Sequence, residues 1–352
     1  HQGEPSEIST ERRRLAEALL ARVGPGRTMT RAWVTEMGAN LENIRAVVAD
    51  DEVTDRTARS LAWSVGQYDD ITSAFRTGIA ELKRCIDLRP EPGPDLVALL
   101  TLQADLLLRV GEVSDAERLT ERAAAMAAEF GVPPWDDMGV IRTRGELALR
   151  SDDPAGAVQL AEAALDSGPA TLRGQARLWN LVAIARHAMG DVAGAAEALE
   201  RCLVAEQEAG LETFLANTHG NFAEVLIALG DPAGAARHQL ASLDAARSMG
   251  QSVNVGFACM VAARFAMEEG RVTDAVIAQT GADTLIDEQG FLLYAGDEQL
   301  RSDLLATARA ELGDEAYERV RAEGRATPTG SIADRSAEIL RRRAAMDPKP
   351  GG

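Results

Sequence analysis

Aromatic residues are scarce in this chain of 352 residues: they account for 4% of it, although hydrophobic residues together account for 46%. Ala and Leu must therefore fill most of the core. This composition suits closely packed helices, because Ala lets backbones approach one another and Leu fills the remaining gaps. Long alternations of Val, Ile, Thr and Tyr are also missing, so nothing in the sequence predicts a β-sheet. We therefore expect an all-α fold.

Basic residues are outnumbered by acidic ones. The chain has 37 Lys and Arg against 55 Asp and Glu, which gives a formal net charge of −18, and Lys83 and Lys349 are its only lysines. An acidic surface repels phosphate backbones, so we predict no direct binding of nucleic acid by this chain. Its hydrophobic runs are all well short of the roughly 18 residues that a membrane span needs. The sequence therefore predicts no membrane association.

Cysteine is rare, and it forms no recognisable pattern. Cys85, Cys202 and Cys259 are far apart in the sequence and match neither a CxxC pair nor a zinc-ligand spacing. An odd number of scattered cysteines is typical of a reducing compartment, so we expect the protein to be cytoplasmic.

Signatures of catalysis are also missing. The sequence contains no HExxH, GxSxG, GxGxxG or GxxxxGK[ST] motif. His187, His219 and His238 are interpreted as belonging to separate repeats, and no i, i+4 pair of histidines supports a metal site. We predict that the chain is not an enzyme and binds neither cofactor nor metal.

The strongest positive signal is a turn that recurs along the chain and is followed by small residues. The first residues of the six turns are Asp69, Gly111, Asp152, Gly190, Gly230 and Gly270, which gives spacings of 42, 41, 38, 40 and 40. An apolar helix precedes each turn, and Gly can end such a helix because it tolerates a left-handed conformation. Asp or Ser then begins the next helix, with Ser114 and Glu117 predicted to form a capping box.

One alanine recurs after each of the later turns, where the two helices of a pair are expected to cross. The five alanines are Ala116, Ala157, Ala195, Ala235 and Ala275. A larger side chain at such a crossing would overpack it.

A second loop near Gly131, Gly168, Gly210, Gly250 and Gly290 closes each unit, so the order is helix A, tight turn, helix B, loop. This order predicts a tetratricopeptide-like, right-handed superhelical solenoid of antiparallel helix pairs with a period of about 40 residues. The A helices should form its concave face.

The sequence also indicates three segments. We predict an N-terminal linker helix at 1–28, the helical-repeat domain at 29–324, and a terminal helix with a mobile tail at 325–352. Within the last segment, 336–346 can be helical with Arg341, Arg342 and Arg343 exposed, and the proline-rich end cannot continue a helix.

Several short stretches resemble a known family. The stretches are ERRRLAEALL at 11–20, Trp33 and Glu36 followed by ENIRAVV at 42–48, LGDEAY at 312–317 and AEGR at 322–325. Together they resemble the C-terminal helical-repeat region of large bacterial STAND-type signal-transduction ATPases, especially actinobacterial LuxR-type and SARP-type transcriptional regulators. The resemblance implies a sensor arm, with nucleotide hydrolysis and DNA binding belonging to segments that this chain does not contain.

Polar residues inside the A helices suggest a working surface. Counting back thirteen, ten and six residues from each turn selects the face that lines the groove in tetratricopeptide arrays, and Thr101 and Asp105 are among the positions reached. The predicted ligand-binding set is Arg142, Glu146, Arg177, Asn180, Asn217, Glu224 and Arg264. Asn can donate to and accept from a peptide backbone, and Arg can hold a carboxylate by two hydrogen bonds.

The same side chains also have a simpler interpretation, in which Arg177 pairs with Glu146 and Arg264 pairs with Glu224. Two functions remain open at this point. The first is a non-catalytic sensor of a cytoplasmic transcriptional regulator that binds a peptide or protein partner on its concave face. The second is a receptor that encloses a small-molecule inducer within the superhelix. The sequence leaves the oligomeric state open.

Overall fold

The computed structural model describes residues 7–51, 53–132, 138–168 and 171–346, and these residues form only helices and their connections. The α-helices are α1 (Glu7–Val23), α2 (Arg31–Val48), α3 (Asp55–Ile71), α4 (Phe75–Leu88), α5 (Pro94–Arg109), α6 (Val113–Glu129), α7 (Met138–Arg150), α8 (Pro154–Asp166), α9 (Leu172–Ala188), α10 (Val192–Ala209), α11 (Leu215–Ala228), α12 (Pro232–Met249), α13 (Ser252–Glu268), α14 (Val272–Glu288), α15 (Ala295–Leu312), α16 (Asp314–Ala326) and α17 (Thr329–Ala344). A 3₁₀ turn, Glu212–Phe214, precedes α11. The all-α helical-repeat fold predicted from the sequence is confirmed.

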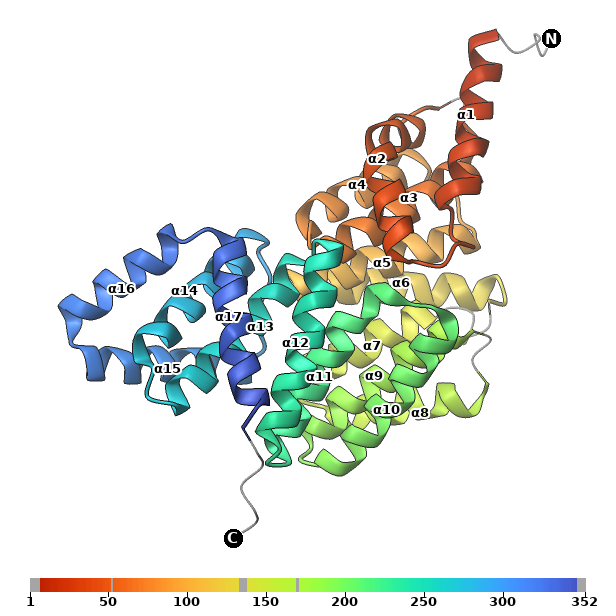
Figure 1. Cartoon of the computed structure of the whole chain (residues 1–352). Helices are drawn as coiled ribbons and strands as arrows, with labels where there is room; N and C mark the ends of the chain where they lie inside the picture. The colour runs from red at the N-terminus through yellow and green to blue at the C-terminus, as the bar shows by residue number, and fades with distance from the viewer. Residues whose placement is uncertain (1–6, 52, 133–137, 169–170, 347–352) are drawn as a thin grey trace. The chain divides into compact units, whose positions relative to one another are not determined.

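The helices divide into two compact units, drawn in Figure 1. Unit 1 comprises 1–181 and 205–212, and unit 2 comprises 182–204 and 213–352, so the division passes through α9 and α10. In unit 1, the A helices are α3, α5, α7 and the first part of α9, and α4, α6 and α8 are their B partners. In unit 2, α11 pairs with α12 and α13 pairs with α14.

A residue with positive φ ends the A helix of each repeat. Gly111, with φ of 82°, is typical of these turns, and Asp152 takes the same conformation with φ of 58°. In the first repeat this residue is Ser73, with φ of 64°. The prediction that the first turn begins at Asp69 is therefore wrong by four residues, and the first interval is 38 residues rather than 42.

The B helices begin in two different ways. At α8 and α12, the side chains of Asp153 and Asp231 accept hydrogen bonds from the first-turn amides of Gly156 and Gly234, at 2.9 and 2.8 Å. The predicted capping box at Ser114 is wrong, because α6 begins at Val113 and its cap position is occupied by a glutamate without a side-chain capping bond.

The recurring alanines are completely buried, as expected where two helices cross closely. The exposed fraction is 0% at Ala116, Ala157, Ala195, Ala235 and Ala275.

Unit 2 is closed by α17, which lies along α12 and α13 (Figure 1). Ile332 and Leu340 of this helix are buried in the same apolar cluster as Phe265 and Leu243. The helix starts at Thr329, earlier than the sequence predicted.

The arginines near the end of α17 differ from the prediction in one respect. Arg341 and Arg342 are exposed, whereas Arg343 is partly buried. The Arg343 guanidinium lies 4.9 Å from the Phe265 ring centroid and donates to Glu268 at 2.8 Å. The tail predicted beyond residue 346 lies outside the described residues. Within the described residues, none of the helices is long and apolar enough to cross a membrane.

Candidate functional site

A cavity of about 440 Å³ opens on the A-helix side of unit 1. Helices α3, α5, α7 and α9 and the segments that link them provide its walls. The lining residues are Pro25, Arg59, Ser60, Trp63, Gln67, Pro94, Asp95, Val97, Ala98, Thr101, Leu102, Asp105, Val132, Gly139, Arg142, Thr171, Arg173, Gly174 and Arg177. Its volume falls within the range of small-molecule ligand sites.

Helix α5 provides the most deeply buried wall. Nearly all of its residues are buried, because it packs against α3, α4, α6 and α7 and is apolar on most sides. Asp105 lies in this setting with 7% of its side chain exposed. Its Oδ2 atom forms an ion pair with Arg142 of α7 and lies 3.6 Å from an Nη atom of Arg177 of α9. Two guanidinium groups therefore converge on one carboxylate oxygen.

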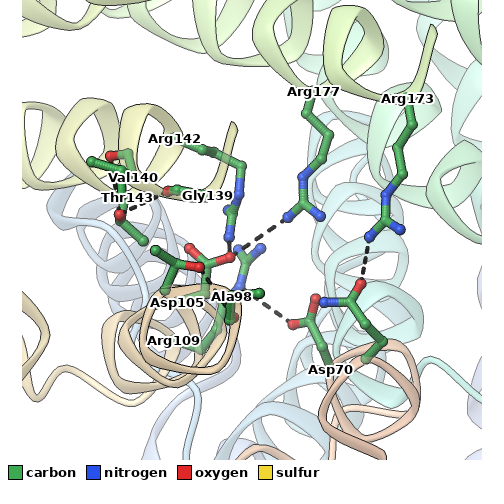
Figure 2. A network of polar contacts seen from close by, with 12 residues as sticks. Asp70, Ala98, Asp105, Arg109, Gly139, Val140, Arg142, Thr143, Arg173 and Arg177 are labelled. Carbon is green, nitrogen blue, oxygen red and sulfur yellow. Dashed lines mark hydrogen bonds and ion pairs between the residues drawn. The ribbon is translucent and has the colours of Figure 1, made fainter. Parts of the chain in front are cut away.

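Arg173 enters the cavity one helical turn before Arg177. It donates to Oε1 of Gln67 on α3 at 2.6 Å, and its guanidinium carbon lies 5.1 Å from the ring centroid of Trp63. The amide and the ring orient the guanidinium from two sides. Figure 2 shows Arg142, Arg173 and Arg177 all pointing toward the side on which Asp70 and Asp105 lie.

Asp70 and Arg109 complete the polar network. Nε of Arg109 lies 3.8 Å from Oδ1 of Asp70, and 14% of the Asp70 side chain is exposed. The cluster drawn in Figure 2 thus contains the four guanidinium groups of Arg109, Arg142, Arg173 and Arg177. The ion pairs of Arg109, Arg142 and Arg177 described above are with the carboxylates of Asp70 and Asp105.

Burial makes this excess of positive charge costly. Removal from water and the nearby Arg177 guanidinium together lower the pKa of Arg142 to about 9. The same two causes lower the pKa of Arg173 to about 9. Burial lowers the pKa of Arg177 to about 10, while Asp70 opposes that change. All three values exceed 7, so these side chains remain charged at neutral pH.

The predicted binding residues of unit 1 separate into two groups. Arg142 and Arg177 line the cavity, whereas Glu146 and Asn180 are not among the described lining residues. Glu146 is 8% exposed, and its Oε1 atom lies 3.9 Å from Nε of Arg150 on the same helix.

The other predicted residues belong to unit 2. Oε2 of Glu224 lies 3.9 Å from an Nη atom of Arg264, which agrees with the simpler interpretation that these two side chains pair with each other. Oδ1 of Asn217 accepts a hydrogen bond from Asn221 at 3.3 Å. The role of all seven residues in ligand binding stays a prediction.

Sequence reasoning missed the wall that α3 contributes, because no binding residue was selected from the first repeat. Counting back thirteen, ten and six residues from Ser73, the true turn, reaches Ser60, Trp63 and Gln67. All three line the cavity. The same counting, applied to the first repeat as well, would therefore have selected this wall. Arg173 could also have been found, because it precedes Arg177 by four residues and so shares its helix face.

Two histidines that were assigned to separate repeats meet in one helix pair of unit 2. Nδ1 of His219 on α11 lies 3.1 Å from Nδ1 of His238 on α12. Burial lowers the pKa of both rings, and His238 contributes further to the lowering at His219. Within the described residues, we find no group of three or more His, Cys, Asp or Glu side chains that could hold a metal ion.

Comparison with known proteins identifies the fold and no family. Neither the family models nor the curated proteins include a match to this chain. The crystal structure of a Rap protein complexed with Competence and Sporulation Factor aligns with a TM-score of 0.61 and 10% identity, over 98% of this chain and 89% of that chain. This similarity supports the helical-repeat fold.

Two further solved structures align less closely. BtubC (BKLC) from P. vanneervenii has a TM-score of 0.42 and 19% identity, over 65% of this chain and 93% of that chain. The apo form of RapI has a TM-score of 0.42 and 12% identity, over 96% of this chain and 98% of that chain. At these scores the two structures add nothing to the assignment of the fold.

Proposed function

We propose that this chain is a non-catalytic sensor domain that binds a peptide ligand in the A-helix cavity of unit 1. The observation that carries the proposal is the cavity itself, in which the apolar surface of Trp63 and Leu102 lies beside the guanidinium groups of Arg142 and Arg177. An apolar wall with a few convergent polar groups is typical of a ligand site.

The helical-repeat fold is compatible with this role. The Rap protein that aligns with this chain was solved as a complex with Competence and Sporulation Factor, so a protein of this fold can bind such a factor. Consecutive A helices place equivalent side chains in adjacent rows, which suits an extended ligand. Asn217, Glu224 and Arg264 belong to unit 2 and stay candidate binding residues of that unit by itself.

The regulatory context is part of the proposal. The stretches at 11–20, 42–48, 312–317 and 322–325 resemble the sensor region of bacterial STAND-type LuxR and SARP regulators. We propose that the chain serves as the cytoplasmic sensor of such a transcriptional regulator, in which ligand binding is communicated to other segments.

A small-molecule inducer is the second candidate ligand. The cavity volume of about 440 Å³ favours it, because this volume would also enclose a compact organic molecule. The two candidates predict different bound ligands. The first predicts a peptide of several residues, and the second predicts a compound without a peptide backbone.

The test is retention of synthetic peptides by the whole chain. The protein is mixed with an equimolar pool of random hexapeptides, separated from unbound peptide by size, and analysed by mass spectrometry. Ala98 lines the cavity, so Ala98→Phe should fill it and abolish retention. Ala125 is exposed on α6, so Ala125→Phe is the matched control and should retain the same peptides as the unaltered chain.

Two results would contradict the proposed function. One is the absence of any retained peptide, and the other is equal retention by the Ala98→Phe variant and the unaltered chain. A compound from a metabolite pool that binds the unaltered chain, but not the Ala98→Phe variant, would favour the inducer receptor.

A further inference from the structure

We infer that the ligand of this cavity is an acidic peptide, and that one of its carboxylates binds between the guanidinium groups of Arg142, Arg173 and Arg177. The inference rests on the proposed function and adds the chemical class of the ligand. It is drawn from the charge, the burial and the convergence of the described side chains.

The charge balance of the cavity is the first observation. Among its described lining residues, Arg59, Arg142, Arg173 and Arg177 are cationic, and only Asp95 and Asp105 are anionic. Adding the Arg109–Asp70 pair leaves the excess unchanged at two positive charges. The whole chain carries a net charge of −18, so this local excess runs against its overall composition.

Burial makes this excess of positive charge unfavourable for the folded protein. The side chains of Arg142 and Arg177 are only 12% and 16% exposed. A charge removed from water and incompletely balanced raises the free energy of the folded state. The lowered pKa values of Arg142 and Arg177 reflect the same cost. An anionic ligand would reduce this cost, whereas a neutral ligand would not.

The geometry favours a carboxylate. Arg142 and Arg177 already converge on one oxygen of Asp105, so their guanidinium groups are held in positions that suit this functional group. Arg173 lies one turn before Arg177 on the same face of α9, which brings a third guanidinium to the same side of the cavity. Guanidinium groups bind carboxylates through pairs of parallel hydrogen bonds.

The remainder of the cavity suits a peptide better than an inorganic anion. Trp63, Val97 and Leu102 form an apolar part of its lining. These residues offer nothing to a bare anion, but they can accommodate the apolar side chains of a peptide. The carboxylate can be the C-terminus of the peptide or a side chain of Asp or Glu, because both present the same group.

The experiment uses four hexapeptide pools and the whole chain. Two pools have a free C-terminus and two have an amidated C-terminus. In each pair, one pool contains Asp and Glu and the other does not. The unaltered chain should retain peptides with a carboxylate about tenfold more than carboxylate-free ones, as expected for a charge-assisted hydrogen bond. Preference for the free C-terminus over the amide identifies the terminal carboxylate, and preference for Asp and Glu in amidated peptides identifies a side chain.

Substitutions then test Arg173 and Arg177, two of the three arginines. Arg173→Gln and Arg177→Gln should each reduce the preference for carboxylates to near unity, whereas Arg177→Lys should keep part of it. Arg144→Gln is the matched control, because Arg144 lies on α7, is 42% exposed and pairs with Glu121. It should leave the preference unchanged. Circular dichroism and the melting temperature show whether each variant is folded, and Arg177→Lys tests the charge if Arg177→Gln does not fold.

The possible failures are distinguishable. If the chain retains peptides but shows no preference for carboxylates, the inference is overturned and the proposed function stands. If inorganic phosphate displaces all acidic peptides and raises the melting temperature as much as they do, the carboxylate assignment is wrong. If no peptide from any pool is retained, the proposed function itself fails.

Discussion

Asp69 of α3 shows how far a single buried carboxyl can depart from its usual chemistry. It is 1% exposed, and its Oδ2 atom has no hydrogen-bond partner within the described structure. Burial and the nearby Glu81 carboxylate together raise its pKa to about 7, although Arg45 opposes the change. The folded protein therefore binds a proton at this carboxyl over a pH range in which the unfolded chain has lost it.

Protonation of Asp69 in the folded protein should make the free energy of unfolding depend on pH. The usual Asp pKa is about 3.9, so the contribution of Asp69 to stability should decrease as pH rises from about 4 to 7. Asp69→Asn removes this titration. The free energy of unfolding of the variant, relative to the unaltered chain, should increase by roughly 2 kcal/mol between pH 5 and pH 8. Chemical denaturation at several pH values measures it.

Asp87→Asn is the control for this measurement. It makes the same chemical change on α4, but Asp87 is 61% exposed and pairs with Lys83. Its stability difference should stay nearly constant with pH. Parallel curves for Asp69→Asn and the unaltered chain would show that the Asp69 carboxyl is ionised in the folded protein.

At the scale of a helix, the capping aspartates explain a second feature of the repeat. Gly234 lies inside the first turn of α12, where an alanine would normally favour the helix. A Cβ atom added at Gly234 would overlap the Asp231 carboxylate, which folds back over this residue to accept its amide proton. The reason for the glycine is therefore the position of the capping carboxylate, and not a left-handed backbone.

A double-mutant cycle tests this explanation. Asp231→Ala should cost about 1 kcal/mol of stability, because it removes the cap. Gly234→Ala alone should change stability little, since the gain in helix propensity offsets the damage to the cap. In the Asp231→Ala background, the same Gly234→Ala change should stabilise by about 1 kcal/mol. Thermal unfolding of the four proteins measures the coupling, and additive effects would refute the explanation.

Helix α17 allows a prediction about packing. Leu340 is 0% exposed and belongs to the core of unit 2, whereas Leu229 at the end of α11 is 50% exposed. Leu340→Ala should destabilise the protein by about 2–5 kcal/mol through lost burial and the cavity it leaves. Leu229→Ala makes the same change at the surface and should alter stability by less than about 0.5 kcal/mol.

Denaturant unfolding compares these two leucine variants directly. Similar midpoints for both would mean that α17 does not contribute to the core as the structure describes.

At the scale of the whole molecule, the cavity and the chain differ in the sign of their net charge. A net charge of −18 repels a polyanion at long range, where the field of the whole molecule acts and the positions of individual side chains matter little. A small acidic peptide is repelled far less, and it can reach the local excess of Arg142, Arg173 and Arg177. The molecule should therefore distinguish a small carboxylate from nucleic acid by size as well as by chemistry.

We predict that the chain does not retain duplex DNA at about 0.15 M salt. Excess DNA should also leave peptide retention unchanged. A mobility-shift experiment checks the first expectation, and the hexapeptide experiment repeated with DNA checks the second. Retention of DNA at this salt concentration, or displacement of bound peptide by it, would show that the arginine cluster is accessible to phosphate backbones.

The sequence by itself determined the features that depend on neighbouring residues. Small residues at one position of each repeat predicted close helix crossings, and Ala116 and Ala275 are completely buried. Turn residues that tolerate positive φ marked the ends of the A helices, and Asp152 has this conformation. Hydrophobic periodicity and turn chemistry act over a few residues, so a single sequence is sufficient to recognise them.

Only the tertiary structure decided which charged side chains meet. Arg173 donates to Gln67, 106 positions away in the sequence, and Arg142 and Arg177 share the carboxylate of Asp105. The sequence selected no residue of the first repeat, whereas Trp63 and Gln67 of α3 line the cavity. The physical reason is that pairing across helices depends on the register and rotation of each helix against its neighbours, and packing of the whole repeat sets both.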